Sequence, residues 1–189
     1  MKLLYSNILP LGTADDQQTI IDCFQEQLAK ADYVEIAVGY VSKASLEELD
    51  NLISDYSIKQ ICLNIGMYYI EGMPESSYHT AVKINKKWRA SRTGEIRIVR
   101  SFKYHGKLYC FYKDGVPFSA IIGSANLGVI KLEASNRRQY EISSLTTDPS
   151  ECKEISDFIQ KLKSPACSAN IEDISDMPLI FEKNTALSG

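Results

Sequence analysis

Residues 104–142 read YHGKLYCFYKDGVPFSAIIGSANLGVIKLEASNRRQYEI. Two apolar runs in this stretch, residues 107–112 and 116–122, flank the dipeptide Asp114-Gly115. Such a dipeptide supplies the positive φ angles that a tight hairpin turn requires. The stretch therefore predicts two antiparallel strands joined by that turn.

The same stretch carries five polar residues that suit phosphodiester cleavage: His105, Lys107, Ser124, Asn126 and Glu141. A phosphodiester resists attack because its anionic oxygens repel nucleophiles. Cleavage therefore needs cations, a nucleophile and an acid for the leaving oxygen. Neutral imidazole is a competent nucleophile near neutral pH, which makes His105 the candidate nucleophile.

The other four residues support this hypothesis. If His105 and Lys107 share a strand, their side chains project from one face, and the ammonium holds a phosphate oxygen beside the imidazole. Ser124 and Asn126 have the same spacing and offer uncharged donors. Glu141 is expected to accept the other imidazole N–H and so to fix the tautomer of the ring.

Each residue also has an ordinary interpretation when it is taken alone. A single histidine is structural more often than catalytic, a single lysine is usually solvated, and Gly-Ser-x-Asn is a common turn sequence. The joint order and spacing favour a site. Glu133 is an alternative to Glu141 as the orienting carboxylate; Glu141 is preferred because it lies in a strand-like run. His79 lacks such neighbours and is expected to be incidental.

The rest of the chain alternates strand and helix patterns. The expected elements are an edge strand at 2–5, a helix at 16–30 capped by Thr13 or Asp15, a strand at 33–38, a helix from Ser42 or Ser45, a strand at 58–65, a helix from Ser77, strands at 95–99 and 140–145, and a helix from Pro149 to about 161. This order predicts βαβ units and a partly parallel sheet. The loop at residues 66–77 follows a strand, at the edge where open α/β sheets place ligands.

Length and composition are those of one globular domain, because the chain has 189 residues of which 44% are hydrophobic. We expect the domain to occupy residues 1–163. From Ser164 the periodicity fades, and residues 164–189 are expected to form a tail or a linker.

Charge is unevenly distributed, although the formal net charge is only -3. Residues 83–107 contain nine basic residues and one acidic residue. Such a sector suits a polyanionic substrate, and it equally suits a solvated helix face. The candidate DNA-binding residues within it are Lys83, Lys86, Lys87, Arg89, Arg100 and Lys103.

The five cysteines are an odd number and form no C-x-x-C pair. With no signal peptide and no apolar run long enough to span a membrane, we expect a reducing cytoplasmic location and no membrane partner. The two histidines form no cluster with cysteine, so no metal site is expected.

The order His-x-Lys, Gly-Ser-x-Asn and Glu resembles the phosphodiesterase motif of the phospholipase D superfamily. Neighbouring sequence narrows the resemblance. The run LNIGMYYIEGMPESSYHTA at residues 63–81, with HGKLYCF and GSANL downstream, is similar to the NgoFVII family of type II restriction endonucleases and their BfiI-like relatives. The resemblance covers nearly the whole chain. It implies an α/β fold in which a mixed, largely parallel sheet is sandwiched between helices.

The resemblance also implies an activity, that of a metal-independent DNA nuclease without a cofactor. The histidine matching His105 attacks the scissile phosphate, and water resolves the covalent phosphohistidine. The family's lysine, serine, asparagine and orienting glutamate correspond to Lys107, Ser124, Asn126 and Glu141. The superfamily usually has Asp where this chain has Tyr112. BfiI-type nucleases also depart there, and the difference argues against a lipid-cleaving member.

The chain contains one copy of the motif, whereas the two-step chemistry needs a second histidine to protonate the leaving oxygen. This predicts a homodimer in which two copies of residues 105–141 build one shared site. The resembling enzymes read DNA with a separate C-terminal domain, so we expect such a domain beyond residue 189. Whether cleavage needs an NTP-dependent partner subunit stays open.

Two other functions compete with the nuclease. One is a lipid phosphodiesterase of the same fold, against which the basic sector and the absence of a membrane-binding amphipathic helix argue. The other is a dimerisation or DNA-binding module whose site is silent, for which a broken motif would be the signature.

Overall fold

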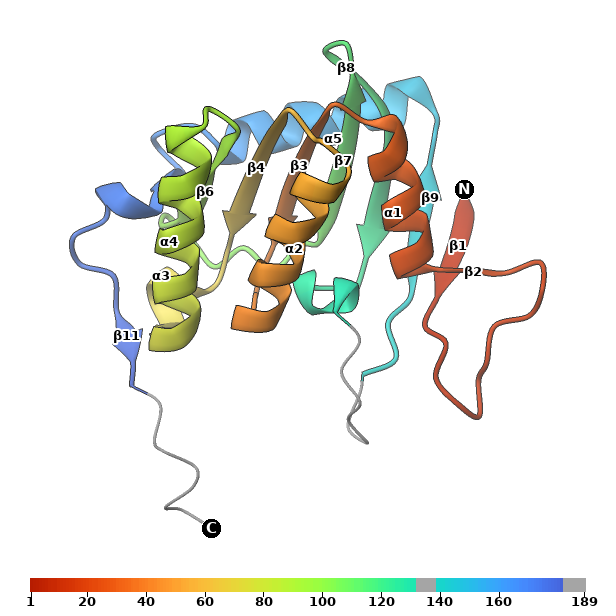
Figure 1. The fold of residues 1–189 in the computed structure, drawn as a ribbon, viewed down its shortest axis with the longest axis horizontal. Coiled ribbons are helices and arrows are strands. Elements are labelled where there is room, and N and C mark those ends of the chain that lie inside the picture. The colour runs from red at the N-terminus through yellow and green to blue at the C-terminus, as the bar shows by residue number, and fades with distance from the viewer. Residues whose placement is uncertain (132–138, 182–189) are drawn as a thin grey trace.

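The computed structural model describes residues 1–131 and 139–181. Within these residues a nine-stranded mixed sheet has the order β10-β6-β4-β3-β7-β8-β9-β1-β2 (Figure 1). The strands are β1 (Lys2–Tyr5), β2 (Gln18–Thr19), β3 (Tyr33–Val38), β4 (Gln60–Ile65), β6 (Gly94–Val99), β7 (Leu108–Lys113), β8 (Val116–Gly123), β9 (Ser143–Thr146) and β10 (Ser168–Asn170). Strands β3, β4 and β6 run parallel, and β7, β8, β9 and β1 continue the sheet in antiparallel pairs.

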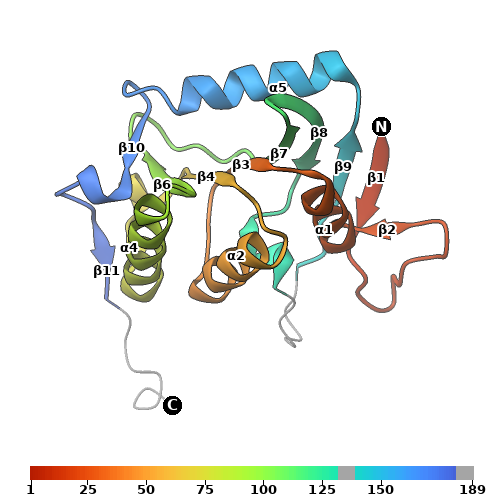
Figure 2. The same cartoon turned by 45° about the horizontal axis from the view of Figure 1, so that its top comes forward.

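Helices cover both faces of the sheet. Helices α1 (Ile20–Lys30), α2 (Lys43–Asp55) and α4 (Glu75–Ala90) lie on one face, and α5 (Pro149–Leu162) crosses the other (Figure 2). The shorter elements are α3 (Tyr68–Glu71), η1 (Leu127–Ile130), η2 (Ile171–Asp173), and the two-stranded sheet of β5 (Met73–Pro74) and β11 (Leu179–Ile180). The expected α/β fold, a mixed sheet between helices, is confirmed.

The alternation of side chains along β3 explains the two layers of core. Val34 and Ile36 point toward the three-helix face and belong to the larger apolar cluster. Glu35 and Ala37 point the other way, and Ala37 belongs to the smaller cluster beneath α5. Because both faces are covered, the strand reads as a nearly continuous apolar run.

The hairpin expected around Asp114-Gly115 is present between β7 and β8. Asp114 has φ 50° and Gly115 has φ 78°, as the tight turn requires. The first helix, in contrast, begins at Ile20 rather than at residue 16. Gln18 and Thr19 pair with β1 and so continue extended, and the Thr19 side chain then accepts the N–H of Asp22 as the cap.

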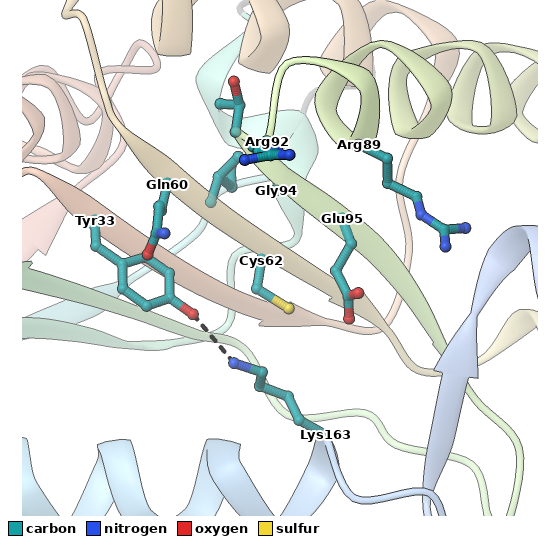
Figure 3. A pocket seen from close by; sticks show the side chains of 10 residues that line it. Tyr33, Gln60, Cys62, Arg89, Arg92, Gly94, Glu95 and Lys163 are labelled. Atoms are coloured by element: carbon teal, nitrogen blue, oxygen red, sulfur yellow. Dashed lines mark hydrogen bonds between the residues drawn. The ribbon is translucent and has the colours of Figure 1, made fainter.

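A network of polar side chains lies buried beneath α5. Glu35 is fully buried, and its carboxylate accepts hydrogen bonds from the Tyr112 hydroxyl, from Gln160 Nε2 at 2.8 Å and from Lys163 Nζ at 2.8 Å. Lys163 also contacts the Tyr33 hydroxyl at 3.1 Å, beside a hollow of about 360 Å³ at the amino ends of β4 and β6 (Figure 3). Tyr112, the residue that replaces the superfamily's usual Asp, is thus a hydrogen-bond donor to a buried carboxylate.

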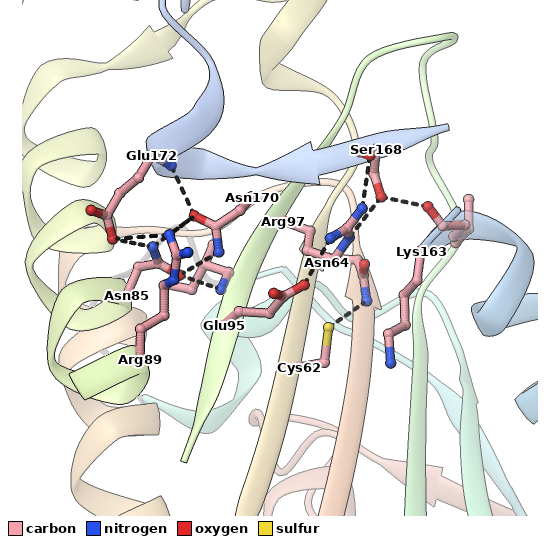
Figure 4. Close-up of polar contacts among 12 residues, drawn as sticks. Cys62, Asn64, Asn85, Arg89, Glu95, Arg97, Lys163, Ser168, Asn170 and Glu172 are labelled. Carbon is pink, nitrogen blue, oxygen red and sulfur yellow. Dashed lines mark hydrogen bonds and ion pairs between the residues drawn. The ribbon is translucent and has the colours of Figure 1, made fainter. Parts of the chain in front are cut away.

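The described part of the expected tail belongs to the folded unit. Strand β10 pairs antiparallel with β6, and Arg97 Nη2 donates to the carbonyl of Ser168 at 2.8 Å (Figure 4). Ile171 and Ile174 are buried in the larger core, and β11 pairs with β5. The unit therefore extends past residue 163 to at least Ile180, while residues 182–189 lie outside the described part.

All five cysteines are described and all are free thiols; only Cys167 is partly exposed. In residues 1–131 and 139–181 no helix combines the length and the apolar character needed to cross a bilayer.

Candidate active site

Three segments that flank strands β3, β7 and β8 meet at the carboxyl end of β3, along the lower edge of the sheet in Figure 1. Gly39 and Tyr40 follow β3, and His105 precedes β7. Asn126 follows β8, and its Oδ1 accepts the backbone N–H groups of Gly39 and Tyr40, each at 3.1 Å. These contacts join the second half of the motif to the end of the parallel sheet.

His105 and Asn126 both lie near the position that a side chain at Gly39 would take. A Cβ atom built on Gly39 would lie 3.4 Å from His105 Cδ2 and 3.5 Å from Asn126 Oδ1. Both groups are therefore neighbours of Gly39, and the tightest contact of such a Cβ would be with Met67 Cγ at 3.2 Å. The imidazole of His105 is exposed.

The orientation of the Asn126 amide follows from its contacts. Because Oδ1 accepts two backbone N–H groups, the Nδ2 group is left as the donor. Ser124 and Asn126 follow β8 in a loop and contact different partners: Ser124 contacts Glu141, and Asn126 contacts Gly39 and Tyr40.

Lys107 is buried, and its Nζ donates to the carbonyl oxygen of His105 at 2.7 Å. Both residues precede β7, which begins at Leu108, so the expected common strand is absent. The ammonium folds back to the backbone of the histidine instead. Burial lowers the pKa of Lys107 below its usual 10.5, and the charge of Glu141 partly offsets this effect.

Glu141 makes a different contact from the one expected. Its carboxylate accepts from the Ser124 hydroxyl, and its backbone N–H donates to Ser6 Oγ at 2.9 Å. Between the described residues there is no hydrogen bond from the His105 imidazole to this carboxylate. The alternative, Glu133, lies outside the described residues. Ser124 and Glu141 therefore form a pair beside the site.

The basic sector of the sequence is divided between the two ends of the sheet. Helix α4 starts near the carboxyl end of β4 and ends before β6, so its later cations lie at the end opposite His105. Two of the candidates on α4 are paired with acids: Lys87 with Asp50 at 2.7 Å, and Arg89 with Glu172 at 3.9 Å. The remaining α4 candidates are Lys83 and Lys86, which are exposed.

At the end of the sheet that carries His105, which we call the catalytic end, the basic candidates are Arg100 and Lys103, in the segment between β6 and His105. Lys103 pairs with Glu71 at 3.5 Å. His79 is exposed on α4 and packs against Tyr78, with 5.5 Å between ring centroids.

Two residues of the site were missed from sequence. The Tyr40 ring meets the His105 imidazole edge-on, with 6.1 Å between centroids, and its hydroxyl donates to Glu71 at 2.7 Å. These residues, Tyr40 and Glu71, had a topological signal: Tyr40 lies two residues after β3, and Glu71 is the last residue of α3, the short helix that follows β4. A hollow of about 730 Å³ lies beside the motif and is lined in part by Asn126 and Glu141. No group of three or more His, Cys, Asp or Glu side chains suited to a metal occurs within the described ranges.

The profile of the NgoFVII restriction endonuclease N-terminal PLD domain, where PLD denotes phospholipase D, matches residues 18–176. The chain belongs to this family. This family consists of phospholipase D-like domains of restriction endonucleases, as the motif predicts. Membership supports a phosphodiesterase that acts as a nuclease. No curated protein is matched by the sequence.

Solved structures agree with the family in fold. NucT from Helicobacter pylori is similar with a TM-score of 0.54 and 13% identity, over 77% of this chain and 87% of that one. Phosphatidylserine synthase from Haemophilus influenzae Rd KW20 is similar with a TM-score of 0.58 and 13% identity, over 89% of this chain. This chain covers only 39% of the length of that synthase. At such identities the likeness establishes the fold alone.

Proposed function

We propose that this chain is the DNA-cleaving domain of a type II restriction endonuclease, in which His105 attacks the scissile phosphate without a metal ion. The observation that carries the proposal is that an exposed imidazole and a fixed amide donor both lie beside Gly39, in a member of a restriction endonuclease family. The Lys107 ammonium is held at the backbone of the same histidine.

The chemistry takes two displacements at phosphorus. In the first, an imidazole nitrogen of His105 forms a bond to phosphorus, and the bond to the leaving nucleotide oxygen breaks. In the second, water attacks the phosphohistidine and returns the imidazole. Lys107 and the Asn126 amide offset charge that gathers on the phosphate oxygens. The Ser124 hydroxyl is held by the Glu141 carboxylate, and the charge of Glu141 also attracts the Lys107 cation.

The leaving oxygen needs a proton, and one chain carries one copy of the motif. We propose a homodimer in which the partner's copy of His105 supplies that proton. An exposed apolar patch beside the site supports this: Leu3 and Ile122 are 44% and 46% exposed, and both are aligned with Ser144 across adjacent strands. Ile142 is 47% exposed next to Glu141. Exposed apolar patches of this kind mark protein–protein contacts.

The dimer is tested by placing a charge in the patch. Ile122→Glu should shift the protein from dimer to monomer in analytical ultracentrifugation and abolish cleavage. Leu9→Glu is the matched control, because Leu9 is 84% exposed and precedes Pro10 in the loop between β1 and β2. A wild-type protein that cleaves as a monomer would refute the shared site.

DNA contact by the described residues is expected to involve phosphates and not base edges. Arg100 and Lys103 lie at the catalytic end and are the nearest candidates. Binding should therefore weaken steeply with salt and show little sequence preference. We propose that sequence recognition belongs to a further C-terminal domain of the enzyme.

The primary test is plasmid cleavage in excess EDTA by the wild type, His105→Ala and His79→Ala. The second histidine is the matched control, because it is exposed on α4. We expect the wild type and His79→Ala to cut and His105→Ala to be inactive. Cleavage stopped in acid-free denaturant should leave a DNA end joined through its phosphate to His105. A requirement for a divalent ion would overturn the metal-independent step. Hydrolysis of phospholipid vesicles in place of DNA would move the substrate class to lipids, and cleavage of neither would indicate a silent module.

A further inference from the structure

Tyr40 connects three parts of the site. Its backbone N–H donates to Asn126 Oδ1 at 3.1 Å, and its ring meets the His105 imidazole edge-on at 6.1 Å between centroids. Its hydroxyl donates to Glu71 Oε2 at 2.7 Å. The hydrogen bond to this carboxylate raises the pKa of Tyr40 to about 12, so the hydroxyl keeps its proton at neutral pH.

Glu71 anchors this tyrosine at the end of α3. The Tyr40 hydroxyl lowers the pKa of Glu71 most, and the charges of Lys103 and His105 add to the effect. Lys103 lies 3.5 Å from the same carboxylate. Glu71 is thus an anion that faces the motif from the side opposite to the Ser124–Glu141 pair.

The Tyr40 ring is held on a second side by Tyr68, with 5.4 Å between centroids in an edge-on arrangement. Tyr68 is itself fixed, because its hydroxyl donates to the carbonyl of Val41 at 2.6 Å and accepts the N–H of Val41 at 2.9 Å. The ring in contact with His105 is therefore clamped by a buried neighbour and by a carboxylate at its tip.

We propose that Tyr40 is a positioning residue for His105, and that its hydrogen bond to Glu71 sets the place of the imidazole for attack. The proposal rests on the proposed function. Glu141 does not reach the imidazole in the described contacts, whereas the Tyr40 ring does. The tyrosine acts by contact, and Glu71 acts through the tyrosine.

The test compares turnover of four variants in the full chain. Tyr40→Phe keeps the ring and removes the hydroxyl, and Glu71→Ala removes its acceptor. Each should lower kcat about 10-fold with KM nearly unchanged, below the roughly 100-fold that a 1 Å misplacement costs. Glu71→Gln keeps an acceptor oxygen and should recover most of the rate. The double variant Tyr40→Phe/Glu71→Ala should be no slower than either single variant, because both break one hydrogen bond.

Tyr69→Phe is the matched control. Tyr69 lies on the same short helix and donates its hydroxyl to Asp176 Oδ2 at 3.0 Å, so the substitution removes the same kind of bond. It should leave kcat unchanged. An equal loss of rate in Tyr69→Phe would mean that loosening α3 causes the effect, and would overturn the positioning role.

A spectroscopic readout separates placement from folding. The chain has two histidines, so His79→Ala assigns the imidazole C2–H proton resonances. The His105 resonance should move in Tyr40→Phe and Glu71→Ala and stay in place in Tyr69→Phe. The reason is that the ring current of Tyr40 shifts this resonance by an amount that depends on where the ring lies relative to the imidazole. Wild-type kcat in Tyr40→Phe and Glu71→Ala, beside an inactive His105→Ala, would refute this inference and leave the proposed function intact. An active His105→Ala would refute the proposed function first.

Discussion

The polar cluster beneath α5 and the polar cluster at the catalytic end differ in how fully their groups are satisfied. Glu35 is fully buried and accepts from three side chains. His105 is exposed, and its imidazole has no hydrogen bond from the described residues. Burying a charge is tolerated only when partners satisfy it, whereas a reacting group must keep free capacity for its substrate. The first arrangement serves stability, and the second leaves the imidazole free for the chemistry proposed above.

The largest effect is expected from breaking the buried pair. Lys163→Met leaves Glu35 with one partner fewer and no countercharge. Removing one partner of a buried pair costs about 3–5 kcal/mol, and the lower end applies because the Lys163 side chain is 25% exposed. Urea unfolding measures the loss, and cleavage per folded molecule should not change.

Lys161→Met is the matched control for that experiment, since Lys161 is exposed in the last turn of the same helix. It should leave stability unchanged. Adding Glu35→Gln to Lys163→Met should restore much of the lost stability, because the unpaired charge is gone. A double variant as unstable as the single one would contradict this account of the cluster.

Asn126 combines both roles, and two substitutions separate them. Asn126→Asp keeps the Oδ1 acceptor for Gly39 and Tyr40 but replaces the amide donor with an anionic oxygen. We expect about 100-fold slower cleavage, the scale of losing one donor to a developing charge, with little change in stability. Asn126→Ala should lose the activity and also about 1–3 kcal/mol, because two N–H groups lose their acceptor. Thermal melts beside single-turnover assays measure both, and equal melts would count against the loop contact.

Tyr112→Phe sharpens the comparison within the buried cluster. Glu35 keeps Gln160 and Lys163 when the hydroxyl is removed, so the loss should be about 1 kcal/mol. Cleavage should continue at the wild-type rate, since this residue is distant from His105 in the fold. The urea midpoint measures the first effect, and a loss of activity at unchanged stability would place Tyr112 in the catalytic apparatus.

The smallest effect concerns pH. Burial penalises the cationic form of Lys107 and lowers its pKa below 10.5, so the ammonium is lost as pH rises through that lower value. Cleavage should therefore decline on the alkaline side before pH 10.5 is reached. Arginine keeps its charge there, so Lys107→Arg should move the decline to higher pH in a pH–rate profile. An unmoved decline would show that another group titrates.

Much of this architecture was predictable from local signals. Strand Tyr33–Val38 matches its predicted range, and the hairpin turn follows from Asp114-Gly115. The start of α1 was wrong because pairing of Gln18 with β1 is a non-local contact. Edge pairing of β10 also depends on distant residues, which periodicity within residues 164–181 does not contain.

The site was predictable in its residue types more than in its contacts. His105, Lys107, Ser124 and Asn126 were proposed from their spacing, and the structure brings His105 and Asn126 to the end of β3. The Ser124–Glu141 contact and the Tyr40–Glu71 pair depend on loop conformation. Loop backbones carry no periodic signal, so single-sequence reasoning did not reach those contacts.

Four of the five thiols are buried, so the molecule is suited to labelling with a fluorescent dye at a single site. Burial raises the pKa of Cys23 to about 11 and those of Cys62 and Cys110 to about 12, and it also raises the pKa of Cys152. A maleimide dye should therefore attach first at the half-exposed Cys167, whose carbonyl accepts the N–H of Arg100 at 2.8 Å beside the catalytic end. Donor- and acceptor-labelled batches of the unmodified sequence can then be mixed, and energy transfer between them would follow subunit exchange of the proposed dimer in real time.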